Sequence, residues 1–281
     1  MVNPVRTILI TGATSGIGLA AARQLAAYGD RLVLVGRNPE KLADAAALVS
    51  AAGAGAVDTI GCDLAIQAEV RALAKTVLAT YDRLDVLANN AGGYFGSRTE
   101  TADGIEATFA VNHLGGFLLT ELLVDLLRDS APARILFTSS VMHYGAAIDF
   151  ADLGMHRGYS GEKAYSRSKL ANILYARALA DRLAGSGVTV NAFHPGAVAT
   201  GIWKSMPWFA KPFLAVAERI FMISADEGGR ALTQLAADPD LADVTGRYFQ
   251  RRQPKTPSRR ARDDELTRRL VEVSYQLVGL G

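Results

Sequence analysis

A glycine-rich segment near the start of the chain, Thr11–Gly18 (TGATSGIG), constrains the fold more than any other stretch. It follows the apolar run Ile8–Ile10 and leads into the helix-like run Leu19–Ala26. Glycines let a backbone turn tightly and approach a ligand closely, and the N–H groups and dipole at a helix N-terminus favour an anion. A strand, a glycine-rich turn and a helix in this order therefore predict a site that holds the phosphates of a nucleotide.

Short apolar runs alternate with helical patterns along the rest of the chain. This alternation indicates a parallel sheet covered by helices on both faces, and the continuous apolar runs fit strands that are buried on both sides. We expect one doubly wound α/β domain over residues 1–281, because no repeat or low-complexity linker divides the chain. The expected strands are Thr7–Ile10, Arg31–Val35, Ala56–Cys62, Val86–Asn89, Ala133–Thr138, Val188–Phe193 and Gly246–Phe249. The expected helices lie near Ile17–Tyr28, Pro39–Ala51, Ile66–Tyr81, Asn112–Asp129, Ala164–Ala184 and Asp226–Ala237.

Composition excludes several classes of protein. A formal net charge of +2 gives no reason to expect nucleic acid as a partner. The single cysteine, Cys62, cannot form an internal disulfide and favours a reducing compartment. The N-terminus lacks a signal-peptide layout, and no uninterrupted apolar stretch approaches the ~20 residues of a membrane span. The four histidines and Cys62 show no metal-ligand spacing, so we expect no metal. The expectation is a soluble cytoplasmic protein, for which contact with a membrane surface is possible but not expected.

The end of the second expected strand bears on which dinucleotide binds. A site that prefers NAD usually places an acidic residue about 20 residues beyond the first glycines, where it bonds the ribose 2′-hydroxyl. Here Arg37 follows the strand Arg31–Val35. A guanidinium suits a 2′-phosphate, so we expect NADP(H) to be favoured over NAD(H). A solvated arginine after a strand is the alternative.

Two further strand ends carry small or polar residues. Asp63 and Leu64 follow the third strand and are candidates to flank an adenine ring. Asn90, Ala91 and Gly92 follow the fourth, where small residues leave room for a ligand at the carboxyl edge of the sheet. A turn rich in Asn and Gly is the plain alternative for the second group.

Tyr165 and Lys169 are four residues apart in an expected helix, so they share one face. An unperturbed tyrosine has a pKa of about 10, which is too high for efficient proton transfer at neutral pH. Lowering that pKa toward ~7 takes about 4 kcal/mol, and a cation about 4 Å away contributes on that order. We therefore expect Lys169 to lower the pKa of Tyr165 and make it a general acid and base.

Six motifs in one order give the chain a family resemblance. They are Thr11-Gly12-x-x-x-Gly16-x-Gly18, Asn89-Asn90-Ala91-Gly92, Asn112 in Val-Asn-His-Leu, Ser139-Ser140, Tyr165-x-x-x-Lys169 and Pro195-Gly196. Together they resemble the short-chain dehydrogenase/reductase family over essentially the whole chain. The long segment between Ser140 and Tyr165, the run Tyr165–Asn172 and the basic segment Ser258–Arg262 resemble its retinol-dehydrogenase-like branch. This resemblance implies a Rossmann fold and an NADP(H)-dependent interconversion of an alcohol and a carbonyl.

The resemblance also implies roles for single residues. Ser140 would hydrogen-bond the substrate oxygen, with Ser139 as the alternative, and Tyr165 would exchange a proton with that oxygen. Lys169 would also hold the nicotinamide ribose, and Asn112 would anchor a water that links Lys169 to solvent. For the hydroxyl of Ser15, phosphate contact and capping of the helix both stay open. The expected cofactor contacts are Gly12, Thr14, Ser15, Gly16, Ile17, Gly18, Arg37, Asp63, Leu64, Asn90, Ala91, Gly92, Tyr165, Lys169, Pro195, Gly196, Val198 and Thr200.

Two stretches are expected to wall the substrate pocket. Val141–Gly161 carries Met142, Tyr144, Phe150 and Met155, and a lid at about 197–224 is dense in aromatic and methionine side chains. Such side chains predict a small-molecule substrate that is a bulky, lipophilic ketone, aldehyde or alcohol. Packing of the second stretch at an oligomer interface or a membrane surface is an equal alternative. His143 either lies at the edge of the substrate pocket or only packs against neighbouring side chains.

Two other functions stay open as hypotheses beside an oxidoreductase. One is a non-catalytic NADP(H)-binding regulator or scaffold of the same fold, and another is an epimerase or dehydratase that uses the same site. The helices near Asn112–Asp129 and Ala164–Ala184 are candidates for the face of a homodimer or homotetramer. The C-terminal extension, about 250–281, contains a run of basic residues: Arg251, Arg252, Lys255, Arg259, Arg260 and Arg262. This run is either a solvated, partly mobile segment or a binding site for an anionic group.

Overall fold

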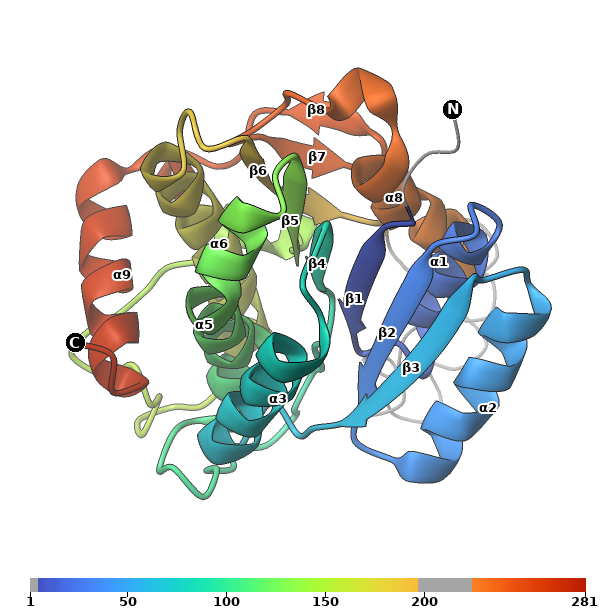
Figure 1. Ribbon diagram of the computed structural model, residues 1–281. Coiled ribbons are helices and arrows are strands. Elements are labelled where there is room, and N and C mark those ends of the chain that lie inside the picture. Colours follow the sequence, from blue (N-terminus) through green and yellow to red (C-terminus); the bar gives the residue numbers. More distant parts are fainter. Residues whose placement is uncertain (1–4, 197–223) are drawn as a thin grey trace.

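One twisted sheet forms the centre of the molecule, with the strand order β3-β2-β1-β4-β5-β6-β7-β8 (Figure 1). The structure is a computed structural model that describes residues 5–196 and 224–281. All neighbouring strands are parallel except β8, which runs antiparallel to β7. The strands are β1 (Thr7–Thr11), β2 (Arg31–Gly36), β3 (Ala56–Gly61), β4 (Val86–Asn89), β5 (Ala133–Thr138), β6 (Val188–His194), β7 (Tyr248–Gln250) and β8 (Gln253–Lys255).

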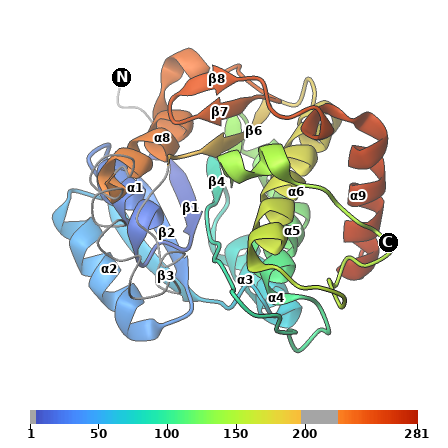
Figure 2. The ribbon, with the colours of Figure 1, turned by 180° about the vertical axis from the view of Figure 1, so that it is seen from behind.

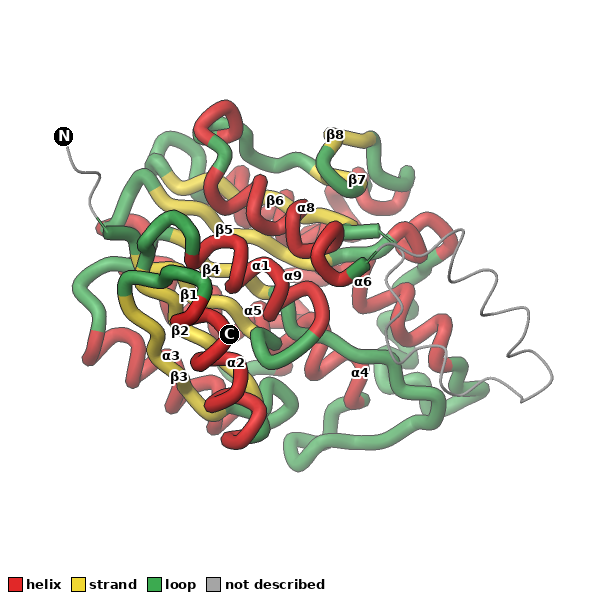
Figure 3. The backbone as a smooth tube through the Cα atoms, turned by 90° about the vertical axis from the view of Figure 1, so that its right-hand side faces the viewer, coloured by secondary structure: helices red, strands yellow, loops and turns green. Residues whose placement is uncertain are grey.

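Helices cover both faces of this sheet, as expected. Figure 1 shows one helical layer on either side of the strands, and Figure 3 views the first layer from its outer side, with α1 and α8 in front of the strands. The first layer is α1 (Gly16–Ala26), α2 (Pro39–Ala51) and α8 (Ala225–Ala237). The second is α3 (Gln67–Thr80), α5 (Gly115–Asp129) and α6 (Gly161–Arg182), with α9 (Asp264–Leu277) outside α6. Short helical turns are α4 (Ala107–Phe109), η1 (Ala110–Leu114), η2 (Val141–Gly145), η5 (Pro239–Leu241) and η6 (Arg260–Arg262).

Alternate residues of the central strands feed two separate apolar cores. Leu9 of β1 packs in the core under α3, α5 and α6, whereas Ile8 and Ile10 pack under α1, α2 and α8. All three side chains are fully buried. The burial of both faces explains why these strands read as continuous apolar runs, and it confirms the doubly wound, three-layer architecture.

Two elements differ from the sequence-based expectation. The last parallel strand starts two residues later than expected, and the added strand β8, with the sequence Gln-Pro-Lys, is wholly exposed. The helix expected from Asn112 begins at Ala107 and continues to Asp129, a length of 23 residues, and its most apolar stretch of 18 residues has a mean hydropathy of 1.4. By length and composition this stretch could cross a membrane, but two thirds of its apolar window is buried inside the fold. It is a core helix.

The chain's own C-terminal helix covers part of the face that we expected to make a dimer. The view from behind places α9 alongside α6 (Figure 2). Arg177 of α6 forms an ion pair with Asp264 of α9 at 3.0 Å. The Tyr275 hydroxyl of α9 donates to Glu121 of α5 at 2.8 Å. The helix α9 therefore occupies part of the outer side of α5 and α6, and the use of these helices as the face of a homodimer or homotetramer stays a prediction.

Candidate active site

The glycine-rich loop packs its backbone directly against the loop that follows β4. Gly12 has a φ of +66°, and a Cβ added there would lie 2.8 Å from the Cα of Ala91. A Cβ on Gly18 would lie 2.3 Å from the Gly12 oxygen. Any larger residue at these two positions would push the loops apart. The glycines thus bring the start of α1 close to the carboxyl ends of β1 and β4.

Among the described residues, no side-chain cap occupies the N-terminus of α1. Ser15 is its N-cap residue, but the Ser15 side chain makes no capping hydrogen bond. Ser15 and Gly16 are both exposed, and Thr14 and Ile17 are partly exposed. Of the two roles left open for the Ser15 hydroxyl, capping is not realised. This hydroxyl and the first N–H groups of the helix fit the phosphates of a dinucleotide.

Asn90 connects the ends of three neighbouring strands. Its amide nitrogen donates to the Thr11 carbonyl oxygen at 3.0 Å, and its amide oxygen accepts from the Thr138 hydroxyl at 3.3 Å. The backbone N–H groups of Asn90 and Ala91 both donate to the Thr11 hydroxyl at 3.0 Å. A Cβ added to Gly92 would lie 3.1 Å from the Lys169 Nζ, so a larger residue here would crowd the buried ammonium group.

Arg37 lies beyond the end of β2, where we expected a contact with a 2′-phosphate. Its side chain is 68% exposed, and one guanidinium nitrogen is 3.6 Å from a carboxylate oxygen of Asp63. The other Asp63 oxygen accepts from the Ala65 N–H at 3.0 Å. Leu64 is buried and packs closely against Gly115 of α5, so its side chain belongs mainly to the core. The arginine is accessible at the nucleotide end of the site.

The two serines after β5 have different partners. The Ser139 hydroxyl donates to the main-chain oxygen of Lys169 at 2.8 Å and is fully engaged in joining β5 to α6. The Ser140 side chain lies beside Tyr165 and lowers the pKa of the tyrosine, and the Ser140 hydroxyl oxygen accepts from the Met142 N–H at 3.2 Å. Only Ser140 therefore presents its hydroxyl beside the tyrosine.

Tyr165 and Lys169 lie on one face of α6, as their spacing predicts. The Lys169 Nζ is 5.4 Å from the centre of the Tyr165 ring and donates to the Thr138 oxygen at 3.2 Å. Burial lowers the pKa of Lys169 to about 8. Burial also raises the pKa of Tyr165, and the Ser140 side chain only partly opposes this. The expected depression by Lys169 is not found in the protein alone, because the pKa of the tyrosine follows its burial and the only opposing cause is Ser140.

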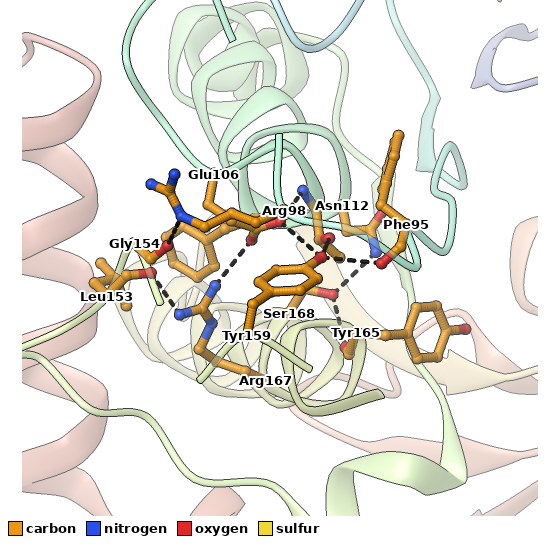
Figure 4. Close-up of polar contacts among 12 residues, drawn as sticks. Phe95, Arg98, Glu106, Asn112, Leu153, Gly154, Tyr159, Tyr165, Arg167 and Ser168 are labelled. Atoms are coloured by element: carbon orange, nitrogen blue, oxygen red, sulfur yellow. Dashed lines mark hydrogen bonds and ion pairs between the residues drawn. The ribbon is translucent and has the colours of Figure 1, made fainter. Parts of the chain in front are cut away.

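The Asn112 amide is held by the backbone after β4. Its oxygen accepts from the Gly93 N–H at 2.7 Å, and its nitrogen donates to the Gly93 oxygen at 2.9 Å and to the Ser168 hydroxyl at 3.0 Å (Figure 4). The Ser168 hydroxyl in turn donates to the Tyr165 carbonyl oxygen at 2.7 Å. Asn112 lies in the π-helical turn η1, an irregularity that often marks functional sites. Its side chain thus fixes the loop that carries Gly92 against α6.

Sequence reasoning missed an aromatic residue next to the tyrosine. Tyr94 is half-buried, and its ring centre lies 6.3 Å from that of Tyr165 at an interplanar angle of 57°. A Cβ on Gly161 would lie 3.0 Å from the Tyr94 ring, so this glycine makes room for the ring at the start of α6. The sequence offered one indication of this residue, because Tyr94 lies only four residues beyond Asn90, in the loop that follows β4.

A buried ion pair supports the loops around Tyr94. Arg167 of α6 donates to Glu106 at 3.0 Å, and the side chains are 4% and 1% exposed (Figure 4). The Tyr159 hydroxyl donates to the Phe95 oxygen at 2.9 Å, and Arg98 donates to the Gly154 oxygen at 2.8 Å. These contacts connect the loop after β4 to the stretch Val141–Gly161 on one side of the site.

The stretch Val141–Gly161 is only partly a pocket wall. Phe150 packs against the Arg269 guanidinium of α9 at 4.4 Å. His143 is fully buried, hydrogen-bonds the Ser140 oxygen through Nδ1 at 2.6 Å, and accepts from the Ser258 N–H at 3.1 Å. Of the two roles considered for His143, these contacts support packing. They also attach the segment around Ser258 to the loop that carries Ser140.

The basic run of the C-terminal extension is exposed along its length. Its backbone is nonetheless attached to the fold, because the Thr256 oxygen accepts from the Tyr144 hydroxyl and the Ala261 oxygen from Arg177, both at 2.8 Å. Arg260 also donates to the Ala146 oxygen at 2.9 Å.

In residues 5–196 and 224–281 no three His, Cys, Asp or Glu side chains form a possible metal site.

The remaining predicted contacts follow β6. Pro195 and Gly196 are buried, next to His194 at the end of the strand. Val198, Thr200 and almost all of the expected lid at 197–224 lie outside the described residues.

Comparison with known proteins agrees with this architecture. The model of the short chain dehydrogenase family matches residues 6–208. Mouse retinol dehydrogenase 14 is 41% identical over 98% of this chain and 86% of its own length, and human retinol dehydrogenase 13 is 40% identical over 99% and 86%. A relative from Streptomyces sp. (strain C5), whose name refers to daunorubicin C-13 ketoreduction, is 42% identical over 98% and 93%.

Solved structures agree as well. A protein from Mycobacterium paratuberculosis has a TM-score of 0.79 at 33% identity, over 98% of this chain and 93% of its own. Pseudomonas aeruginosa RhlG, in an active-site complex with NADP, has a TM-score of 0.71 at 28% identity, over 89% and 96%. The family supports a nicotinamide dinucleotide as cofactor and a small molecule as substrate, in an oxidoreductase that acts on CH–OH groups. The chain belongs to the short-chain dehydrogenase/reductase family and to its retinol-dehydrogenase-like branch.

Proposed function

We propose that this protein is an NADP(H)-dependent oxidoreductase that interconverts a bulky, lipophilic alcohol and its ketone or aldehyde, with Tyr165 as the acid and base. The observation that carries the proposal is the meeting of Ser140, Tyr165 and Lys169 beside the glycine-rich loop. A protein that only binds a dinucleotide needs the loop but not this set of side chains.

The side chains have complementary tasks in reduction. The Tyr165 hydroxyl gives a proton to the substrate oxygen, and its raised pKa keeps it protonated at neutral pH. The Ser140 hydroxyl donates a hydrogen bond to the same oxygen, where negative charge develops. The bound nicotinamide would supply the hydride. In oxidation Tyr165 takes the proton back, and the positive charge of Lys169 favours the tyrosinate that accepts it.

The preference for NADP(H) rests on Arg37. The guanidinium is mostly exposed at the end of β2, and its ion pair with Asp63 at 3.6 Å is long and solvated. Such an ion pair contributes little to stability. The arginine can therefore leave Asp63 and contact a 2′-phosphate with little loss of free energy. The complex of RhlG with NADP is in line with this choice.

The substrate class rests on the relatives and on Tyr94. The names of several relatives refer to retinol, and one refers to daunorubicin ketoreduction. An aromatic ring 6.3 Å from that of Tyr165 is a suitable wall for a bulky, lipophilic molecule.

The test is a cofactor and substrate screen on the purified protein. NADPH and NADH are each combined with a small aldehyde, a long-chain aldehyde and a polycyclic ketone, and cofactor absorbance is followed. We expect consumption of NADPH with the larger carbonyls, and none with the Tyr165→Phe variant. Binding of NADPH without consumption would indicate a regulator or scaffold. Conversion of a substrate without net consumption would indicate an epimerase or dehydratase.

A further inference from the structure

A buried polar chain runs from the C-terminal helix to the catalytic end of the sheet. Ser274 of α9 contacts the Nε2 atom of His113 at 3.1 Å, and the Nδ1 atom of His113 contacts the amide oxygen of Asn172 at 3.1 Å. The Asn172 amide nitrogen then donates to the main-chain oxygens of Asn112 at 2.9 Å and Thr138 at 3.1 Å. The side chains of His113, Asn172 and Ser274 are at most 3% exposed.

The hydrogen-bond inventory of these groups fixes their orientation. Both protons of the Asn172 amide nitrogen are used on carbonyl oxygens, so its oxygen can only accept, and Nδ1 of His113 must carry the proton. Burial lowers the pKa of His113 to about 4, so the ring is neutral and Nε2 can only accept. The Ser274 hydroxyl donates to the Leu270 oxygen at 2.8 Å, so its one proton is shared between that oxygen and Nε2 of His113. The rings of Phe109, at 5.0 Å, and Phe117, at 5.9 Å, hold the imidazole in place.

The two carbonyl oxygens at the end of this chain belong to the active site. The Thr138 oxygen also accepts from the Lys169 Nζ at 3.2 Å, so Asn172 and Lys169 share one acceptor. The other oxygen belongs to Asn112, whose side chain fixes the loop that carries Gly92. A shift of the Asn172 amide would therefore move the atom that holds the ammonium beside Tyr165.

We propose that His113 and Asn172 are positioning residues: His113 orients the Asn172 amide, and that amide sets the Asn112 and Thr138 oxygens around Lys169. The inference rests on the proposed function, since it assigns these residues to the same reaction. Neither residue touches the reacting groups, so their effect on turnover passes through Lys169.

Two substitutions of the histidine separate this role from simple packing. In His113→Asn the amide nitrogen takes the place of Nδ1 and still donates to Asn172, whereas in His113→Gln it takes the place of Nε2 and reaches toward Ser274. The asparagine leaves the larger cavity. A packing role therefore predicts that His113→Asn is the worse variant, and the positioning role predicts the opposite.

The experiment measures kcat, the KM for NADPH and the melting temperature of each full-length variant. We expect Asn172→Asp and His113→Gln to lower kcat about tenfold or more, which is a rise of about 1.4 kcal/mol in the barrier, with little change in the KM for NADPH. His113→Asn should keep most of the wild-type kcat. Tyr275→Phe, which loses the contact of α9 with Glu121, is the control for a weakened α9 and should keep kcat.

Two results would overturn the proposal. One is a kcat that follows melting temperature across all variants, the Tyr275→Phe control included. The other is a greater loss of kcat in His113→Asn than in His113→Gln. Failure of the proposed function would appear elsewhere, as a wild-type chain without NADP(H)-linked turnover.

Discussion

The Ser139 hydroxyl donates to the main-chain oxygen of Lys169 over 2.8 Å, and this bond fastens the end of β5 to the helix that carries Tyr165. The side chain of the next residue, Ser140, instead lies beside Tyr165 and lowers its pKa. We therefore expect the two adjacent serines to have separate tasks, with Ser139 in stability and Ser140 in the proposed reaction.

Replacing each serine by alanine should separate these two tasks. Ser139→Ala removes the hydrogen bond between the end of β5 and a buried carbonyl of α6, and should lower the free energy of unfolding by about 0.5–1.5 kcal/mol. Ser140→Ala should lower kcat by about 10²-fold or more, because the substrate oxygen loses a donor, with a much smaller effect on stability. Urea unfolding and steady-state kinetics measure the two effects. Equal effects of both variants on kcat would contradict this division.

Tyr165→Phe should remove nearly all turnover. Loss of a general acid lowers the rate by about 10²–10⁴-fold, and the phenyl ring keeps the packing with Tyr94. NADPH affinity, measured by fluorescence titration, should stay close to that of the wild type. A variant with full activity would rule out the proposed mechanism.

Arg37→Gln should weaken the binding of NADPH and leave the binding of NADH almost unchanged. Loss of a charge-assisted contact with a 2′-phosphate corresponds to about 1.5–3 kcal/mol, or roughly a tenfold to hundredfold rise in the KM for NADPH. Lys41→Gln, one turn into α2 and also exposed, is the matched control for a lost positive charge. Equal changes for both cofactors would show that Arg37 does not discriminate between them.

Tyr94→Ala should change substrate preference more than rate. Removal of the ring beside Tyr165 takes away apolar contact area, so kcat/KM should fall about tenfold for a polycyclic ketone and much less for a small aldehyde. Tyr28→Ala, an exposed tyrosine beyond the C-terminal end of α1, serves as the control. The ratio of the two kcat/KM values is the measurement, and an unchanged ratio argues against a wall formed by Tyr94.

Stability should fall as the pH is lowered below about 6.5, the ordinary pKa of a histidine. Burial lowers the pKa values of His113 and His194 to about 4, and burial also lowers that of His143. Above about pH 6.5 these histidines are neutral in both states, so their contribution is complete. Between about pH 6.5 and 4 the unfolded chain binds protons that the folded chain does not, at up to about 1.4 kcal/mol per pH unit for each histidine.

Urea unfolding at several pH values gives this slope directly. His113→Asn should flatten it by the contribution of about one proton, whereas a slope unaffected by the substitution would mean that His113 titrates normally in the folded protein.

The sequence predicted what depends on short stretches of chain. The glycine-rich loop precedes α1 as its pattern required, and the spacing of Tyr165 and Lys169 placed both on one face of α6. The strand β8 was missed because Gln-Pro-Lys carries no apolar signal. The direction of the Tyr165 pKa was missed because burial depends on residues from several elements.

Contacts between distant residues were beyond such reasoning. His113 is 59 residues from Asn172 and 161 residues from Ser274, and no local pattern links them. The run Tyr165–Asn172 placed Asn172 one turn beyond Lys169, but the partners of its amide become visible only when α5, α6 and α9 are packed together. Tyr94 was missed for the same reason, since only the fold brings it beside Tyr165.

The covering of α6 by α9 also sets an order of assembly during synthesis. The strands and helices that bind a dinucleotide all leave the ribosome before residues 264–277, so they can begin to pack while α9 is still being made. Until then the imidazole of His113 lacks its Ser274 partner, and the outer side of α6 faces water. The nascent chain should therefore acquire affinity for the nucleotide earlier than it acquires full catalytic competence, with the last helix completing the enzyme.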